Sequence, residues 1–172
     1  MNEVVIFYES IKNIKYGWHN KKGDVFKTLK EGNFYKNYYM QDIKNIKKSG
    51  YAICWELCEL ERKFFRENKF NYKTIFALSR EDGKYFCHTF LIFENNDCWY
   101  WFEVSWNNQK GIHKFSSINE ILEYIKNNFS DFVGKKDYDK EKVVFFSYKK
   151  PYFIRRCNLF YFHCMKTGVK IK

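Results

Sequence analysis

A single amphipathic helix in the middle of the 172-residue chain constrains the fold more than any other feature of the sequence. Over residues 54–68, Leu57, Leu60 and Phe64 recur at helical spacing. Acidic side chains come early in this stretch and basic ones come late, an order that suits the helix dipole. The pattern predicts a helix that buries one face and begins at Cys54.

Three extended segments follow this helix directly. They are rich in aromatic and β-branched residues, and they cover residues 72–78, 85–94 and 98–106. Short polar stretches separate them, with Asn95 and Asn96 forming the second turn. A helix followed by consecutive strands that short turns connect predicts an antiparallel sheet, and so the fold class is α+β.

The remaining segments complete one domain over residues 1–172, with a core at about 14–128 and a C-terminal extension at 129–172. Residues 4–8 indicate a short buried strand, and a second helix at 42–48 ends at Gly50. Ser117 and Glu120 have the spacing of a capping box and open a helix through Asn128. Residues 142–148 indicate another strand, whereas the aromatic stretch 152–164 fits a strand or a helix equally well.

The formal net charge of +11 has little functional meaning by itself. Lysines are spread along the whole chain, and no recognised nucleic-acid motif accompanies them, so a nucleic-acid partner is not expected. No stretch approaches the roughly 20 apolar residues of a membrane span, and no membrane partner is expected. Six cysteines without a Cys-x-x-Cys pair favour reduced thiols in the cytoplasm.

Cys54 is the cysteine best placed for nucleophilic chemistry. The N-terminus of a helix presents free N–H groups and a partial positive charge, which stabilise a thiolate. Cys58 lies one turn further into the helix and loses most of that field. The other four cysteines fall in strands or in the C-terminal extension, where a small buried thiol is the ordinary interpretation.

A base and a carboxylate for Cys54 come from the second and third extended segments. If Asn95 and Asn96 form a two-residue turn, His88 lies directly opposite Glu103 on the same face of the hairpin. A carboxylate there can hold one imidazole nitrogen and leave the other for the thiol. A slip of one residue would separate the two faces, and a surface ion pair is the simpler alternative.

These segments resemble the transglutaminase-like core of the papain-like cysteine fold, and in particular a group of small uncharacterised bacterial proteins of that type. The resemblance rests on Cys54-Trp55-Glu56, on the His88-Thr89-Phe90-Leu91 segment, and on Trp101-Phe102-Glu103. It implies a helix that carries the cysteine, packed on an antiparallel sheet that carries the histidine and the acidic residue. Such triads usually end in aspartate, so Glu103 departs from the pattern, and Ala52 replaces a common glycine.

Several other residues are weaker candidates. Trp18 and Gln41 are candidates for an oxyanion donor beside the backbone N–H of Cys54, and Trp55 and Trp101 for substrate contacts. His113 is an alternative base. A metal site that joins Cys54 and Cys58 to His163 or Cys164 fits no known ligand spacing, so no metal or other cofactor is implied. Glu56, Glu59 and Arg62 are expected to form a solvated helix face.

The sequence therefore predicts a cysteine-dependent acyl-transfer enzyme that acts on an amide or peptide carbonyl of a peptide or protein. Cys54 would attack, His88 would carry the proton and Glu103 would orient His88. Hydrolysis or deamidation needs only water and is the default over transamidation. The alternative is a catalytically inactive transglutaminase-like module that binds a protein or a polyanionic partner.

Overall fold

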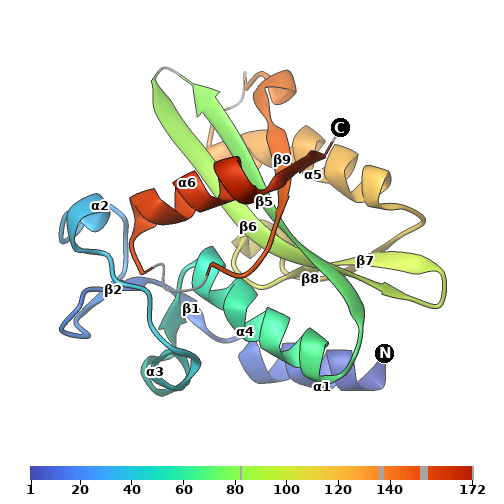
Figure 1. Cartoon of the computed structure of the whole chain (residues 1–172), viewed down its shortest axis with the longest axis horizontal. Helices are drawn as coiled ribbons and strands as arrows, with labels where there is room; N and C mark the ends of the chain where they lie inside the picture. The colour runs from blue at the N-terminus through green and yellow to red at the C-terminus, as the bar shows by residue number, and fades with distance from the viewer. Residues whose placement is uncertain (82, 136–137, 152–154, 172) are drawn as a thin grey trace.

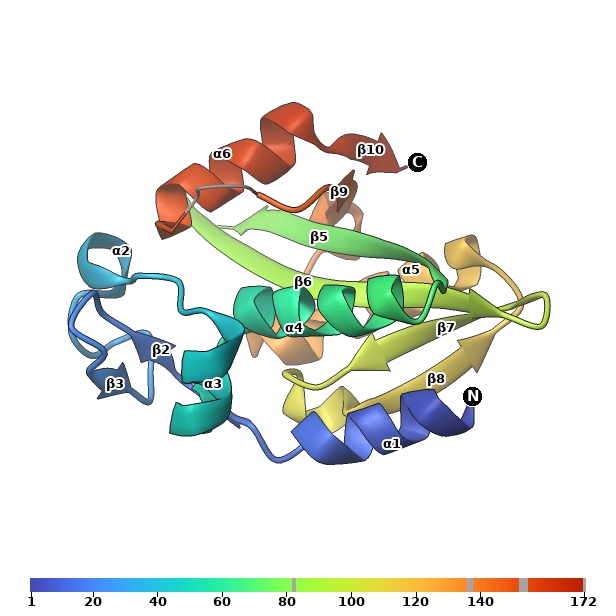
Figure 2. The same cartoon turned by 60° about the horizontal axis from the view of Figure 1, so that its bottom comes forward.

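A large antiparallel sheet covered by helices on both faces forms the body of the molecule (Figures 1 and 2). The computed structural model describes residues 1–81, 83–135, 138–151 and 155–171. Their helices are α1 (Asn2–Ile11), α2 (Phe34–Asn37), α3 (Ile43–Ser49), α4 (Cys54–Glu67), α5 (Ile118–Val133) and α6 (Cys157–Thr167). The strands are β1 (Lys15–Tyr16), β2 (Trp18–His19), β3 (Val25–Phe26), β4 (Tyr51–Ala52), β5 (Asn71–Glu81), β6 (Lys84–Asn95), β7 (Cys98–Glu103), β8 (Gly111–Phe115), β9 (Val144–Tyr148) and β10 (Val169–Ile171). The fold is thus α+β.

The main sheet has the strand order β10-β9-β5-β6-β7-β8, and all of its pairs are antiparallel. Helix α4 packs against β5 and β6, and α1 and α6 lie on the same side of the sheet (Figure 2). Helix α5 covers the opposite face. Strands β9 and β10 therefore extend the sheet that the central strands begin, so the C-terminal part of the chain is continuous with the core.

Alternation along β5 divides its side chains between the two faces. Ile75 and Ala77 belong to the core cluster that includes the buried side chains of α5. Phe76 and Leu78 belong instead to a cluster with Trp55 of α4 and the buried residues of α6. Successive side chains of a strand point to opposite faces, so a strand with both faces covered is apolar along most of its length. Residues 74–79 of β5 are accordingly all buried.

The N-terminal segment forms a helix, and the prediction of a strand at residues 4–8 was wrong. Val4 and Ile11 are seven residues apart, share one side of α1 and are almost fully buried. Phe7 stacks on Phe102 with ring centroids 5.7 Å apart, and Tyr8 meets the same ring edge-on at 5.6 Å. A short apolar run fits a strand or a helix by composition, and here packing against β7 favours the helix.

The predicted helix starts are confirmed. Helix α4 begins at Cys54, and α3 has Asp42 as its N-cap and Gly50, with φ 70°, after its last turn. The Ser117 hydroxyl accepts the Glu120 N–H at the start of α5. An N-cap side chain fixes the start of α3 and of α5, whereas at the start of α4 the Glu56 carboxylate accepts the Ile53 N–H.

The third predicted strand and the C-terminal extension differ in detail. β7 ends at Glu103 rather than at residue 106, and residues 111–115 add an unpredicted edge strand, β8. The stretch 152–164 contains most of helix α6, and its residues 152–154 lie outside the described part of the chain. Within the described residues, no helix is both long and apolar enough to cross a membrane.

Candidate functional site

The β6–β7 hairpin places His88 and Glu103 on one face, although its turn differs from the predicted one. Asn96 and Asp97 form the turn, with φ 50° and 57°, and Asn95 pairs with Cys98. The register is shifted by two residues, so Glu103 lies level with Phe90 and diagonally across from His88. The expectation of a directly opposed pair was wrong, but a shift of two residues preserves the face.

A short hydrogen bond nevertheless joins these two side chains. His88 Nε2 lies 2.7 Å from Glu103 Oε2, and the side chains are 1% and 2% exposed. The other carboxylate oxygen, Oε1, accepts the backbone N–H of Ser105 at 2.7 Å and that of Trp106 at 2.8 Å. Burial acts to raise the pKa of Glu103, but His88 and these N–H groups outweigh it and lower the pKa. Glu103 is thus held as a fully hydrogen-bonded carboxylate.

Aromatic rings hold the imidazole of His88 in place. Its ring centroid lies 5.8 Å from Phe90, 5.8 Å from Trp106 and 5.0 Å from Phe132 of α5. Burial acts to lower the pKa of His88, but the charges of Glu103 and Cys54 outweigh it and raise the pKa to about 10. Because Nε2 is bonded to Glu103, Nδ1 is the ring nitrogen left for a proton from elsewhere.

Cys54 is the first residue of α4, and it is half-buried. Burial acts to raise the pKa of its thiol, but interactions with His88 and Thr89 outweigh burial and lower the pKa. The influence is mutual, because Cys54 contributes to the raised pKa of His88. One turn further along α4, burial raises the pKa of Cys58 well above its usual value.

The pairing of β6 with β7 explains how a side chain on the α5 face interacts with α4. This pairing runs from Leu91 to Asn95, and β7 ends at Glu103. At His88, β6 pairs with β5 through Ala77, and the β6–β7 pairing stops at Leu91, before it reaches His88. The imidazole therefore lies where β7 has turned away, close to the start of α4.

The polar residues of α4 are buried, which contradicts the expectation of a solvated face. Glu56, Glu59, Glu61 and Arg62 are each 6% exposed or less. Glu56 accepts the backbone N–H groups of Ile53 at 3.1 Å and Gln41 at 2.9 Å. The chain around residues 40–42 therefore covers this side of the helix. A helical pattern reports which positions are polar, but it does not report what packs over them.

Glu61 is a buried carboxyl group close to the triad, and the sequence analysis did not identify it. Burial raises the pKa of Glu61 well above its usual range, and the negative charge of Glu103 raises it further. The raised pKa favours the protonated form of Glu61, which lowers its competing negative charge beside the His88–Glu103 pair. Its position two turns after Cys54 was the available signal, because residues seven apart share a helix face.

The four weaker candidates lie in the core or have other partners. The Trp18 indole N–H donates to the carbonyl of Thr28 at 2.9 Å, and the Gln41 amide donates to that of Tyr39 at 2.9 Å. Trp55 stacks on an aromatic ring of α6, Phe160, with a centroid distance of 3.7 Å. Trp101 is fully buried against α5. The structure does not bring these four side chains to an open surface beside Cys54.

The alternative base, His113, belongs to a different environment. It lies on β8, and its Nε2 is 2.7 Å from the carbonyl oxygen of Gln109. Its ring also packs on Trp101 with a centroid distance of 5.0 Å. Neither Cys54 nor a carboxylate takes part in these contacts.

Tyr16 and Cys87 are neighbours of the site that the sequence analysis did not select. Tyr16 pairs with Ala52 across the parallel β1–β4 pair, two residues before the thiol. Burial raises its pKa well above the usual value, and the charge of Cys54 raises it further. Cys87, next to His88 in β6, lies 3.0 Å from the Tyr161 hydroxyl. Only the parallel pairing of β1 with β4, which the sequence does not reveal, brings Tyr16 here.

Comparison of the chain with protein-family models and with curated proteins finds no match. In the described part of the chain, no group of three or more His, Cys, Asp and Glu side chains could hold a metal ion. The chemistry of the site is therefore argued from its own geometry.

Proposed function

We propose that the protein is a cysteine-dependent acyl-transfer enzyme that uses Cys54, His88 and Glu103. The observation that carries the proposal is the 2.7 Å bond between the buried His88 and Glu103, beside a helix-start thiol of lowered pKa. A cysteine nucleophile needs a stabilised thiolate, a base and a group that orients the base. The finer fold assignment, a papain/transglutaminase-like arrangement, belongs to the same proposal.

The opposing pKa shifts favour a resting thiolate–imidazolium pair. The Cys54 thiolate attacks the carbonyl carbon, and the oxygen gains the negative charge. As the tetrahedral intermediate collapses, Nδ1 of His88 gives its proton to the leaving amine or ammonia, and a thioester remains on Cys54. Water then attacks the thioester, His88 takes its proton, and the carboxylic acid leaves as the thiolate re-forms.

Glu103 acts by holding the imidazole rather than by exchanging protons. Its Oε2 accepts from His88, while Oε1 is fixed by the N–H groups that follow it in the chain. This arrangement stabilises the imidazolium form and leaves Nδ1 directed away from the carboxylate.

The developing oxyanion needs donors near the start of α4. The first N–H groups of a helix have no intrahelical partner, and the helix dipole favours negative charge there. We assign the first donor to the backbone N–H of Cys54. The Tyr16 hydroxyl is the second, because its segment is paired next to the nucleophile. Water suffices as the acceptor in this scheme, so hydrolysis or deamidation is proposed ahead of transamidation.

Turnover of an activated acyl donor tests the proposal. With p-nitrophenyl acetate, we expect a burst of about one equivalent of p-nitrophenolate and an acetyl group on Cys54, located by mass spectrometry. The Cys54→Ala variant should lose the burst, and His88→Ala should slow it. The matched control is Cys98→Ala, because Cys98 is also half-buried. A burst that survives Cys54→Ala, or no burst at all, would favour the inactive binding module instead.

A further inference from the structure

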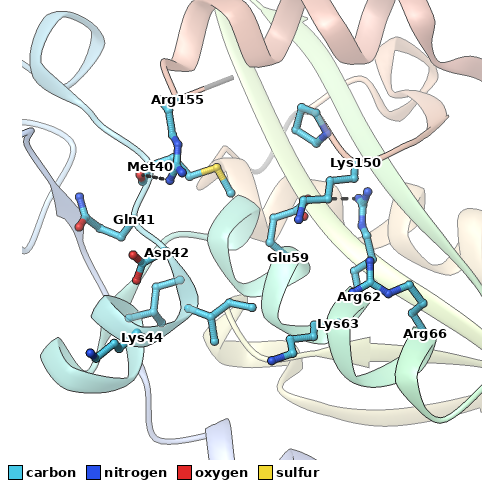
Figure 3. Close-up of a pocket in the computed structure, with 13 residues that line it drawn as sticks. Met40, Gln41, Asp42, Lys44, Glu59, Arg62, Lys63, Arg66, Lys150 and Arg155 are labelled. Atoms are coloured by element: carbon cyan, nitrogen blue, oxygen red, sulfur yellow. Dashed lines mark hydrogen bonds and ion pairs between the residues drawn. The ribbon is translucent and has the colours of Figure 1, made fainter. Parts of the chain in front are cut away.

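A cavity lies along the outer side of α4, and the proposed catalytic residues do not line it (Figure 3). Its volume is about 720 Å³, which is within the range of small-molecule pockets. Helices α3 and α4, residues 40–42, residues 150–151 and Arg155 form its described walls. The lining residues are Met40, Gln41, Asp42, Ile43, Lys44, Ile46, Glu59, Arg62, Lys63, Arg66, Lys150, Pro151 and Arg155.

Positive charge predominates in this cavity. Six of its lining residues are Lys or Arg, and two are Asp or Glu. Lys44, Lys63 and Arg66 are exposed. Lys63 and Arg66 come from α4, whereas Lys44 comes from α3 and its side chain points away from α4 (Figure 3). A cavity lined mainly by cations and by low-dielectric walls attracts an anion more strongly than the same charges on an open surface.

Two buried charged side chains at the α4 wall have unused hydrogen-bonding atoms. Glu59 is 6% exposed, and neither of its carboxylate oxygens has a hydrogen-bond partner among the described residues. Arg62 is 5% exposed, and its Nε–H is without a hydrogen-bond partner in the same set. The two side chains form an ion pair with Nη2 and Oε1 3.3 Å apart. Buried polar atoms without partners are costly, and a ligand is one way to satisfy them.

Further contacts fix Arg62 and Arg155 in place. Arg62 Nη2 donates to the Thr74 hydroxyl at 2.8 Å, and its guanidinium carbon lies 5.1 Å from the ring centroid of Tyr148. Arg155 Nη1 donates to the carbonyl of Met40 at 3.1 Å, which joins two walls of the cavity. Hydrogen bonds of buried or partly buried side chains therefore fix the walls of the cavity, and exposed lysines are not needed to define its shape.

We propose that this cavity binds a small phosphorylated molecule that carries hydroxyl groups. Lys63 and Arg66 would bind the phosphate by charge-assisted hydrogen bonds. A hydroxyl group elsewhere on the same ligand would donate to the Glu59 carboxylate, and a lone phosphate ion lacks this second group. Met40, Ile43 and Pro151 supply an apolar surface for the rest of the ligand. This site goes beyond the proposed acyl transfer, and neither requires the other.

Isothermal titration with a defined panel tests the site. The probes are adenosine 5′-monophosphate, ribose 5-phosphate and glycerol 3-phosphate, with inorganic phosphate and adenosine as the single-feature controls. We expect at least one phosphate ester to bind with a Kd below about 1 mM, and about tenfold more tightly than either control. If no ester binds more tightly than inorganic phosphate, the cavity is only a basic surface and the proposal is overturned.

Paired charge removals locate the binding. Lys63→Ala/Arg66→Ala should weaken the best ester by about tenfold or more, whereas Lys47→Ala/Lys48→Ala should change it less than about twofold. Both variants lose two positive charges, but Lys47 and Lys48 do not line the cavity. Equal effects of the two variants would refute a localised site.

Glu59→Gln tests the hydroxyl contact, with its thermal unfolding checked against the parent protein. It should weaken the ester but leave inorganic phosphate unaffected, and equal weakening of both probes would contradict the assignment. Cys54→Ala should bind the ester unchanged, so the outcome is separate from that of the acyl-transfer test.

Discussion

His88 and Glu103 lie diagonally across the β6–β7 hairpin, and yet their side chains meet at 2.7 Å. A directly opposed pair would place the Cβ atoms about 4.5–5.5 Å apart, and a diagonal pair places them further apart. The longer side chain of glutamate spans this extra distance. Glutamate, in place of the aspartate that the resemblance led us to expect, therefore suits the diagonal geometry of this hairpin.

Glu103→Gln is expected to lower the reactivity of Cys54. The substitution removes the negative charge that raises the pKa of His88, so less imidazolium is present to stabilise the thiolate. At pH 6 the rate of alkylation by iodoacetamide should fall about tenfold or more, since each unit of thiol pKa changes the thiolate fraction tenfold. The loss should shrink as the pH rises, because the thiol then ionises without help.

Ser105→Ala is the control for this experiment. It removes one hydroxyl that donates to Glu103 at 3.1 Å and keeps the backbone N–H donors and the charge. Its effect on the alkylation rate should stay below about threefold. If Glu103→Gln has no larger effect than Ser105→Ala at pH 6, the carboxylate does not act through His88.

Asp97→Gly is expected to stabilise the protein without altering the site. Asp97 adopts φ 57° in the two-residue turn, where glycine has no steric penalty. The free energy of unfolding, measured with urea, should rise by less than about 1 kcal/mol, because relief of the left-handed strain exceeds the entropy that glycine adds to the unfolded chain. A loss of stability would contradict the left-handed turn, and a change in Cys54 alkylation would show that the register had moved.

Glu56→Ala should destabilise the fold strongly, because two buried N–H groups lose their acceptor. We expect a loss of about 2–4 kcal/mol in urea unfolding. Glu120→Ala is the matched control, since Glu120 holds the same position in α5 and accepts the Ser116 N–H at an exposed site. It should cost less than about 1 kcal/mol. Similar losses for the two variants would mean that burial of Glu56 is unimportant.

Arg62→Ala leaves the carboxylate of Glu59 buried without its cation. Its removal should lower the free energy of unfolding by about 3–5 kcal/mol. For comparison, Lys12→Ala breaks an exposed ion pair with Glu9 and should cost less than about 1 kcal/mol. An Arg62→Ala variant as stable as Lys12→Ala would show that water reaches Glu59 freely.

Local signals in the sequence predict much of the α+β fold. Helix α4 and its start at Cys54 follow from spacing and from the order of charges, and the strands after it follow from composition and turns. The exact turn does not, because Asn95-Asn96 and Asn96-Asp97 both tolerate positive φ. The strand predicted at residues 4–8 was wrong because Phe7 and Tyr8 pack on Phe102 of the distant β7, a contact that no local pattern contains.

The candidate site shows the same division. The choice of Cys54 follows from its position at a helix start, and that of His88 and Glu103 from the alternation of side chains along the hairpin. A register shift of two residues leaves both side chains on the same face. Tyr16 and Glu61 were not identified, because their closeness to the site depends on the β1–β4 pairing and on the packing of α4. The cavity beside Arg62 depends on contacts between distant parts of the chain, such as that between Met40 and Arg155, which are 115 residues apart. Spacing along the sequence carries no information about such contacts.

The most direct measurement of the central claim is the rate at which iodoacetamide alkylates Cys54 relative to Cys98 between pH 5 and pH 9. Both thiols are half-buried, but only Cys54 lies at a helix start beside His88. We expect Cys54 to react about tenfold faster or more at pH 6, and His88→Ala to abolish that advantage. Equal rates for the two thiols, or an advantage that persists in His88→Ala, would contradict the triad.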